Sequence, residues 1–187
     1  MANPVKLQAT YFNQREYQLQ GKNHFEVQFG VNKNGADDGK GLWTDDLTLL
    51  VKSFPLPSES AEVVPIDHFN QQIKLAGKTT FDGGSLVIHD AITPDKDVEL
   101  MFRQWRNMVY NASQGTVGYA ADYKTDGIVT EYSPNGETYR QWYLVGCWPN
   151  QVNYGELDYE TGGYKDITAT ITYDWAYRLD KDDAANA

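Results

Sequence analysis

The sequence predicts a mainly β protein, an antiparallel β-barrel or sandwich with one flanking amphipathic α-helix. Short runs of alternating apolar and polar residues dominate the chain from about residue 24 onward. Turn-rich sequences such as "FPLPSES", "AGKTTFDGG" and "YSPNGET" separate these runs. One segment, at about 94–112, has the apolar spacing of a helix instead. Many short strands separated by such turns are typical of an antiparallel sandwich or barrel.

The first strand is expected in "HFEVQFGV", where Phe25, Val27 and Phe29 alternate with polar side chains. In "YSPNGET", Pro134 supplies a fixed φ and Gly136 a positive one, as a tight hairpin turn between two strands requires. Comparable strand-like runs occupy residues 47–54, 61–66, 69–75, 85–92, 128–132 and 139–147, with a weaker candidate at 117–123.

The clearest strand pattern is "ITATITYDWAY", close to the C-terminus. Three threonines and Asp174 occupy one face of this expected strand, and apolar or aromatic residues occupy the other. The face expected in the core consists of Ile167, Ala169, Ile171, Tyr173, Trp175 and Tyr177.

The helix is expected in "TPDKDVELMFRQWRNMVYNASQG". Thr93 is the expected N-cap, Pro94 suits the first helical position, and Gly115 marks the exit. Burying its apolar stripe contributes roughly 10 kcal/mol before opposing terms, so the helix is expected to dock on a sheet. The stripe recurs at three- and four-residue spacing and consists of Val98, Met101, Phe102, Trp105, Met108 and Val109.

The chain of 187 residues fits a single domain at about 23–178, flanked by an N-terminal arm at 1–22 and a C-terminal tail at 179–187. The arm is rich in amides and carries the aromatic residues Tyr11, Phe12 and Tyr17. Two interpretations of the arm stay open, an interface that folds against a neighbour and a disordered leader. The segment "NKNGADDGKG" is expected to be a solvated loop.

Charge and cysteine content restrict the class of partner. The chain has 26 acidic and 16 basic side chains, a formal net charge of −10, and no cluster of Lys and Arg. This balance argues against tight DNA binding, although not against DNA passing close by. With a single cysteine, Cys147, we expect no intramolecular disulfide and a reducing compartment. The sequence contains neither a signal-peptide pattern nor eighteen consecutive apolar residues, so no membrane partner is expected.

We expect no catalytic, cofactor or metal site, and therefore no enzyme. The histidines His24, His68 and His89 are far apart and lack the spacing of a metal-binding pair. The chain has no Gly-x-Ser-x-Gly elbow, no phosphate-binding loop and no dinucleotide fingerprint. Acidic pairs such as Glu156 and Asp158 are expected by chance in a chain of this composition.

Aromatic residues make up 13% of the chain and support an alternative, a carbohydrate-binding β-sandwich module or a glycan-active protein. Trp105 is expected in the core, which leaves Trp43, Trp142 and Trp148 as surfaces on which a sugar can stack. The stretch "GCWPNQVNYGELDY" is consistent with a sugar groove or with a structural corner. In the second interpretation Trp148 anchors the corner by burial and Pro149 fixes the direction of the chain.

The order of several motifs resembles the tail tube proteins of contractile-tailed bacteriophages, which are related to the tube protein of type VI secretion. The motifs are the Leu-Pro loop "FPLP", "KLAGKTTF", "LVIHD", a helix with "FRQW", the "GCWP" corner and a final alternating strand ending in "DWAY". Their order and spacing hold from about residue 45 to residue 178. The long 32–43 loop, Gly83-Gly84 and the N-terminal arm depart from the family pattern.

The resemblance implies a structural subunit that forms hexameric rings, which stack into a hollow tube for DNA ejection. It implies as partners other copies of the chain, a tail sheath protein, and tape-measure and baseplate proteins, with genomic DNA passing through the lumen without specific binding. The expected location is the virion tail, assembled in the host cytoplasm. The structural and assembly candidates are Tyr11, Phe12, Tyr17, Trp43, Trp105, Trp148 and Pro149.

Overall fold

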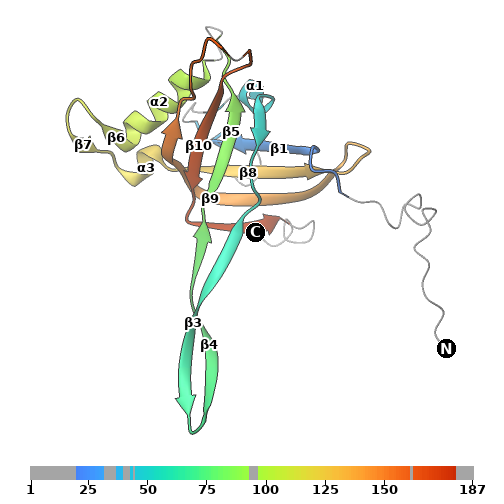
Figure 1. The fold of residues 1–187 in the computed structure, drawn as a ribbon, viewed down its shortest axis with the longest axis vertical. Helices are drawn as coiled ribbons and strands as arrows, with labels where there is room; N and C mark the ends of the chain where they lie inside the picture. The colour runs from blue at the N-terminus through green and yellow to red at the C-terminus, as the bar shows by residue number, and fades with distance from the viewer. Residues whose placement is uncertain are drawn as a thin grey trace, which may run out of the picture.

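The computed structural model describes residues 20–31, 37–39, 43, 45–92, 97–160 and 162–179. A two-layered body carries one long hairpin that projects away from it (Figure 1). In chain order the elements are β1 (Phe25–Phe29), α1 (Asp45–Thr48), β2 (Val51–Ser53), β3 (Ser58–His68), β4 (Gln71–Asp82), β5 (Gly84–His89), α2 (Val98–Val109), β6 (Tyr110–Asn111), β7 (Thr116–Val117), α3 (Ala120–Tyr123), β8 (Thr125–Tyr132), β9 (Thr138–Asn153), β10 (Asp166–Thr172) and β11 (Trp175–Leu179).

Seven strands form the body in the order β1-β8-β9-β10-β5-β2, with β11 paired to β9, and every pairing is antiparallel. β9 belongs to both layers, because its first part pairs with β8 and β11 and its last part with β10. Among the described strands β1 and β2 end the order and do not pair with each other. The prediction of a mainly β antiparallel fold is confirmed, as a sandwich and not a closed barrel.

The "GCWPNQVN" stretch lies inside β9 and is not a connection between strands, which corrects the predicted corner. The strand changes partner near Gly146, whose φ of 70° is in the left-handed region that favours glycine. The Gly146 N–H donates to the Asp126 carboxylate at 2.9 Å. Pro149 is fully buried and pairs with Ile171 of β10, so the strand continues past it into the second layer.

Helix α2 covers one side of the body and contributes Val98, Phe102 and Trp105 to the core. Trp105 is fully buried, and its indole N–H donates to the Tyr123 carbonyl at 2.7 Å. The helix begins at Val98 because the Asp97 side chain caps it, accepting from the Leu100 N–H at 2.8 Å. The predicted helix is confirmed, but it is shorter at both ends than 94–112. The predicted cap Thr93 and the following Pro94 lie outside the described residues.

Two predicted strands are partly helical. Within 47–54, the chain forms the end of α1 and then the short β2. The Trp43 indole donates to the Thr48 hydroxyl at 3.0 Å, a contact between residues five positions apart that a fully extended chain cannot make. The predicted strand at 117–123 contains only the last residue of β7, Val117, and then helix α3. The reason is Gly118, which turns back against α2, its N–H donating to the Val109 carbonyl at 3.1 Å.

The predicted final strand is two strands, β10 and β11, separated by Tyr173 and Asp174. At the break the Asp174 N–H donates to the Val145 carbonyl at 2.9 Å. The interruption shifts the alternation by one residue, so Ala176 points into the core in place of Trp175. Trp175 is 50% exposed, and its predicted burial is wrong.

Strands β3 and β4 form a hairpin that extends well beyond the body (Figure 1). The pairing runs from Ser58 opposite Asp82 to His68 opposite Gln71, with a two-residue turn at Phe69 and Asn70. Every residue of β3 is exposed. The runs at 61–66 and 69–75 are confirmed as extended chain, apart from the two turn residues. Their position outside the core was not predicted.

Candidate functional site

One layer of the sandwich ends in two open strand edges. The layer consists of β1, β8, the first part of β9 and β11, in that order. Among the described strands none pairs with the outer edge of β1 or of β11. Because each pairing is antiparallel, β1 and β11 run in opposite directions. Open edges present unpaired N–H and C=O groups, which are a template for joining another chain.

The face of this layer that points away from the core carries polar side chains together with Ile128, Tyr177 and Leu179. Val27, Val129 and Leu144 face the core, so the residues that alternate with them face outward. The outward residues on the register rows are Glu26, Thr130, Gln141 and Leu179 on one row and Gln28, Ile128, Tyr143 and Tyr177 on the next. Among the described residues that these four strands place on this face, the charged groups are the carboxylates of Glu26 and Asp126. The ion pair of Lys124 with Asp174, at 2.7 Å, lies at the end of the layer beside Gly146.

Hydrogen bonds hold both carboxylates in place. Glu26 accepts from the Gln28 amide at 2.8 Å and from the Tyr132 hydroxyl. Burial, followed by the hydrogen bond and the charge of Glu26, raises the pKa of Tyr132 to about 12. Asp126 accepts from the Tyr143 hydroxyl at 2.6 Å and from the Gly146 N–H at 2.9 Å. The face therefore presents fixed negative charge among neutral polar groups.

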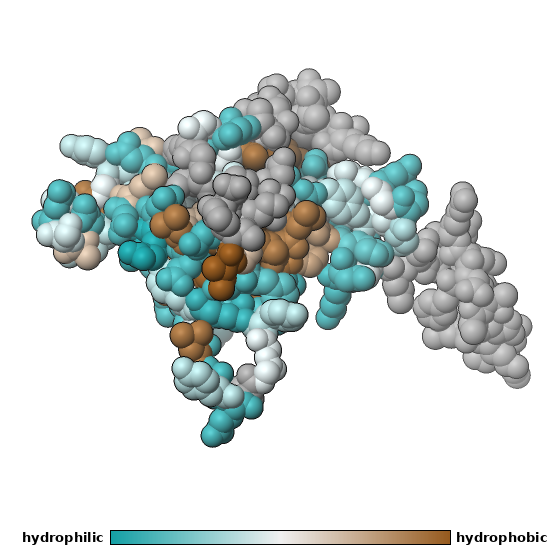
Figure 2. Space-filling view, turned by 90° about the horizontal axis from the view of Figure 1, so that it is seen from above, coloured by the Kyte–Doolittle hydropathy of each residue, from teal (hydrophilic) through white to brown (hydrophobic). Residues whose placement is uncertain are grey.

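The projecting hairpin exposes a row of apolar side chains on one face and an aromatic side chain at its tip. Val64 lies opposite Leu75 and Ile66 opposite Ile73, and each is between 41% and 51% exposed. Phe69 at the tip is 94% exposed. A concentration of exposed apolar residues of this size is characteristic of an interaction surface. The face of the molecule that is seen from above is largely hydrophilic, with several separate hydrophobic patches (Figure 2).

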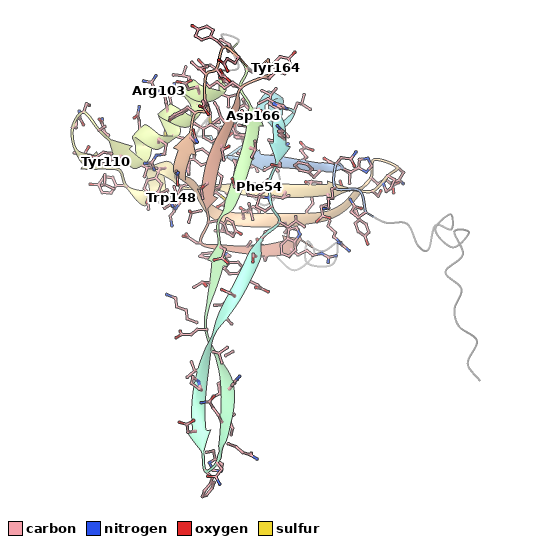
Figure 3. The ribbon with its side chains drawn as sticks, in the orientation of Figure 1. Phe54, Arg103, Tyr110, Trp148, Tyr164 and Asp166 are labelled. Carbon is pink, nitrogen blue, oxygen red and sulfur yellow. The ribbon has the colours of Figure 1, made fainter. Side chains whose placement is uncertain are left out.

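The predicted tryptophans lie at different depths. Trp43 is 9% exposed, and its ring packs edge-on against Phe29 at 5.1 Å. Trp43 and Trp105 are therefore core residues. Trp148 is half-buried and packs against Tyr123 with ring centroids 5.8 Å apart (Figure 3).

Pro149 joins Trp148 in holding α2 and α3 to the sheet. Its carbonyl accepts from the Arg106 guanidinium at 3.0 Å. The structure thus brings these two predicted residues together and places them apart from Trp43. The arm residues Tyr11, Phe12 and Tyr17 lie outside the described residues.

The outward residues Glu26, Gln28 and Asp126 and the hairpin tip are the functional candidates that the sequence did not single out. Alternation in "HFEVQFGV" marks the outward residues as polar, but it does not show that they share a face with β11. The run "VVPIDHFNQQIKL" predicts strands, and its apolar residues are ordinarily a sign of burial. Exposure on both faces emerges only from the tertiary structure.

The described residues hold no group of three or more His, Cys, Asp and Glu side chains placed to bind a metal ion. Cys147 is fully buried, and burial, followed by the charges of Asp126 and Asp174, raises the pKa of its thiol well above the usual value. A protonated buried thiol is a poor nucleophile. No described helix is long and apolar enough to span a membrane.

Comparison with known proteins agrees with this architecture. The family model described as phage tail tube protein matches residues 20–178. The tail tube protein gp19 of Enterobacteria phage T4 is 28% identical over 120 residues, covering 62% of this chain and 71% of that protein.

Two solved structures share the fold at low sequence identity. The sheath–tube complex of the extracellular contractile injection system PVC, in its extended state, matches with a TM-score of 0.60, 13% identity and coverage of 92% of this chain and 97% of the other. The anti-feeding prophage cap, which terminates the AFP tube, matches with a TM-score of 0.60, 12% identity and coverage of 86% and 91%. Because the family model spans most of the sequence, the chain belongs to the phage tail tube proteins, a family of structural subunits and not of enzymes.

Proposed function

We propose that copies of this chain join edge to edge into closed hexameric rings, which stack into a hollow tail tube through which DNA leaves the capsid. The observation that carries this proposal is the pair of open edges on β1 and β11. The number six rests on the family resemblance.

The directions of the two edges fit a ring. When neighbouring copies have the same orientation, β11 of one copy lies antiparallel to β1 of the next, as in the pairings inside the chain. Such a head-to-tail contact closes into a ring when the rotation between copies closes. The strands then form one continuous inner sheet, and the exposed edges disappear.

The outward face of this layer then lines the lumen. Glu26 and Asp126 repel the phosphates of passing DNA, and the amide and hydroxyl groups between them offer no strong anchor. Lys and Arg would instead release counterions from the duplex and hold it. An acidic and neutral lining therefore suits transport of DNA without retention.

The hairpin extends toward the next ring, and its apolar residues supply the contact area for stacking. The PVC relative was solved as a complex of sheath and tube, which supports a tail sheath protein as an outer partner. Tape-measure and baseplate proteins are the further proposed partners. We also assign an assembly role to the 1–22 arm through Tyr11, Phe12 and Tyr17. The proposed location is the virion tail, with assembly in the host cytoplasm.

Negative-stain microscopy of the purified protein tests the proposal directly. Class averages of rings or tube ends are expected to show six-fold symmetry, and native mass spectrometry a mass six times that of the chain. Monodisperse monomers at every salt and protein concentration tested would contradict self-assembly. Rings of another number would contradict the hexamer alone.

The carbohydrate-binding alternative has lost one of its three candidate tryptophans, because Trp43 is buried and hydrogen-bonded in the core. Trp148 packs against Tyr123. The alternative predicts glycan binding that Trp148→Ala abolishes while the fold is kept, as measured on a glycan array.

A further inference from the structure

We propose that the tip of the β3–β4 hairpin inserts into a socket at the base of the hairpin of a second copy of this chain. The inference rests on the proposed self-assembly and names the contact that connects successive rings. The socket is the cavity described in the next paragraph, and the tip is the turn at Phe69 and Asn70.

The socket is a cavity of about 550 Å³ between the start of β1, the end of β8 and the segment that leads into β3. Phe54, labelled in Figure 3, lies in that segment. The volume is sufficient for an aromatic side chain and the turn that carries it. The apolar part of the wall consists of Phe25, Phe54, Pro55, Leu56 and Val129.

Two polar atoms in the wall of the socket have no hydrogen-bond partner among the described residues. Glu131 lines the cavity and is only 8% exposed, yet its Oε1 has no hydrogen-bond partner among the described residues. The Nδ1 atom of His24, also in the wall, is likewise unpartnered within the described part of the chain. Buried polar groups in native proteins are nearly always hydrogen-bonded. The proposed occupant supplies a hydrogen-bond donor for this carboxylate.

The hairpin tip carries an aromatic side chain that suits the apolar wall of the socket and amide groups that can donate to Glu131. Phe69 is 94% exposed and is held at a φ of 53°, a region that non-glycine residues seldom occupy. The His68 ring packs edge-on against the Phe69 ring at 4.6 Å, which fixes the aromatic knob. Asn70 and Gln71 follow with exposed amide groups, which are donors for Glu131.

Charge at the rim agrees with this occupant. Asp67 lies next to the tip and accepts from the Gln72 amide at 3.1 Å, which holds its carboxylate there. Lys22 and Lys52 line the mouth of the socket. Because Lys52 is already paired with Asp166 at 2.7 Å, the tip carboxylate meets the ammonium group of Lys22 at this rim.

The chain cannot insert its own tip into its own socket. Socket residues 54–56 precede the first residue of β3, whereas Phe69 lies at the far end of that strand. Leu56 and Phe69 are thirteen positions apart, which at about 3.3 Å each separates the two by roughly 40 Å. Because the tip and the socket lie at opposite ends of the hairpin, their contact is head-to-tail and continues in one direction. The inferred repeat along the hairpin axis is therefore on the order of 40 Å.

Disulfide trapping tests the contact. The variant Ser53→Cys with Asn70→Cys places one cysteine in the socket wall and one beside Phe69, and leaves the buried Cys147 unchanged. After assembly under reducing conditions and then mild oxidation, non-reducing electrophoresis is expected to show a ladder of covalent multimers. Each single-cysteine variant is the control and is expected to stay monomeric on the gel.

The outcomes separate this contact from the proposed function. Tubes with a ladder support the inference. Tubes without a ladder, or a cross-link that forms only when Tyr17→Cys replaces Asn70→Cys, overturn the inference and leave the tube function standing. Wild-type protein that forms no rings or tubes overturns both.

A second variant covers the case in which the cysteine protein fails to assemble. Phe69→Ala is expected to raise the protein concentration needed for tubes at least about tenfold, because each contact loses one buried aromatic side chain. Tyr159→Ala is the matched control, because Tyr159 is fully exposed in a loop outside the hairpin. Tubes of Phe69→Ala forming at the wild-type concentration overturn the inference.

Discussion

Trp105 connects helix α2 to the rest of the core. Its ring lies 6.0 Å from the Phe29 ring of β1, and its indole N–H is satisfied by the Tyr123 carbonyl. Trp105→Ala is expected to lower the free energy of unfolding by about 3 to 5 kcal/mol, because it leaves a cavity in a packed core. Urea denaturation followed by circular dichroism measures the change. Trp175→Ala is the control at a half-exposed position, and an equal loss in the two variants would contradict the assignment of Trp105 to the core.

Gly146 is the residue at which β9 passes between the two layers. A Cβ atom there would lie 2.5 Å from the Asp174 carboxylate, and φ is 70°. Gly146→Ala is therefore expected to destabilise the fold by about 1 to 2 kcal/mol through backbone strain, with the clash in addition. Thermal unfolding measures the loss. Gly162→Ala, where an added Cβ meets open space, is expected to change stability by no more than a few tenths of a kcal/mol.

Trp105 and Trp175 show how far the sequence predicts the burial of single residues. Helical spacing places Trp105 on the buried stripe correctly, because the periodicity is continuous through α2. Trp175 follows the break between β10 and β11. No local pattern in the sequence shows that Tyr173 and Asp174 lie outside the two strands. At the break Asp174 also pairs with Lys124 at 2.7 Å, a contact between residues fifty positions apart.

At the scale of the elements, Asp166 links three strands of the second layer. At the start of β10, its carboxylate lies 2.7 Å from Lys52 of β2 and 2.7 Å from His89 of β5 (Figure 3). The hydrogen bond from Lys52, and then that from His89, lowers the pKa of Asp166 below its usual 3.8, against the opposing effect of desolvation. The ionised carboxylate therefore stabilises the fold above about pH 4.

Asp166→Asn is expected to cost no more than about 1 kcal/mol at pH 7, because the cluster is open to solvent. The difference from wild type should shrink as the pH falls below about 4, because the unfolded chain takes up the proton there and the folded carboxylate follows at a lower pH. Unfolding curves collected from pH 3 to 7 measure it. Glu59→Gln removes a carboxylate from the exposed hairpin and is the control. A difference that persists unchanged at low pH would contradict the role of the ionised carboxylate.

Some features of the secondary-structure elements cannot be predicted from the local sequence. Alternation in 139–147 predicts a strand, but the continuation through Trp148 and Pro149 depends on pairing with β10. A proline ordinarily argues against the interior of a strand. Here Pro149 coincides with a register shift near Ile171, which accommodates the missing donor. The open edges of β1 and β11 depend equally on the order of strands, which alternation does not encode.

At the scale of the whole molecule, the proposed tube is expected to let duplex DNA pass, because β1, β8, β9 and β11 place no Lys or Arg among the described residues of the outward face. Gln28→Lys with Gln141→Lys adds two positive charges per copy to the outward face. Tubes of this variant should retain DNA at low salt and release it as salt increases, since lysine contacts displace condensed counterions. Co-sedimentation of labelled duplex with tubes measures retention.

The matched control for the lining is Gln104→Lys with Asn107→Lys, which adds the same charge to exposed positions on α2. Equal DNA retention by the two variants would show that the outward face does not line the lumen. Retention by the first variant alone would support the proposed lumen.

The alternating directions of β1, β8, β9 and β11 have an evolutionary consequence. The edges of a layer with an even number of such strands meet antiparallel when all copies point the same way. One extra strand at an edge would make the number of strands odd. The edge strands of neighbouring copies would then pair in parallel, or every second copy would have to be inverted. A lineage built on this layer can therefore widen or narrow its bore by changing the number of copies or by gaining whole hairpins. Adding a single strand would instead prevent antiparallel pairing between copies that all have the same orientation.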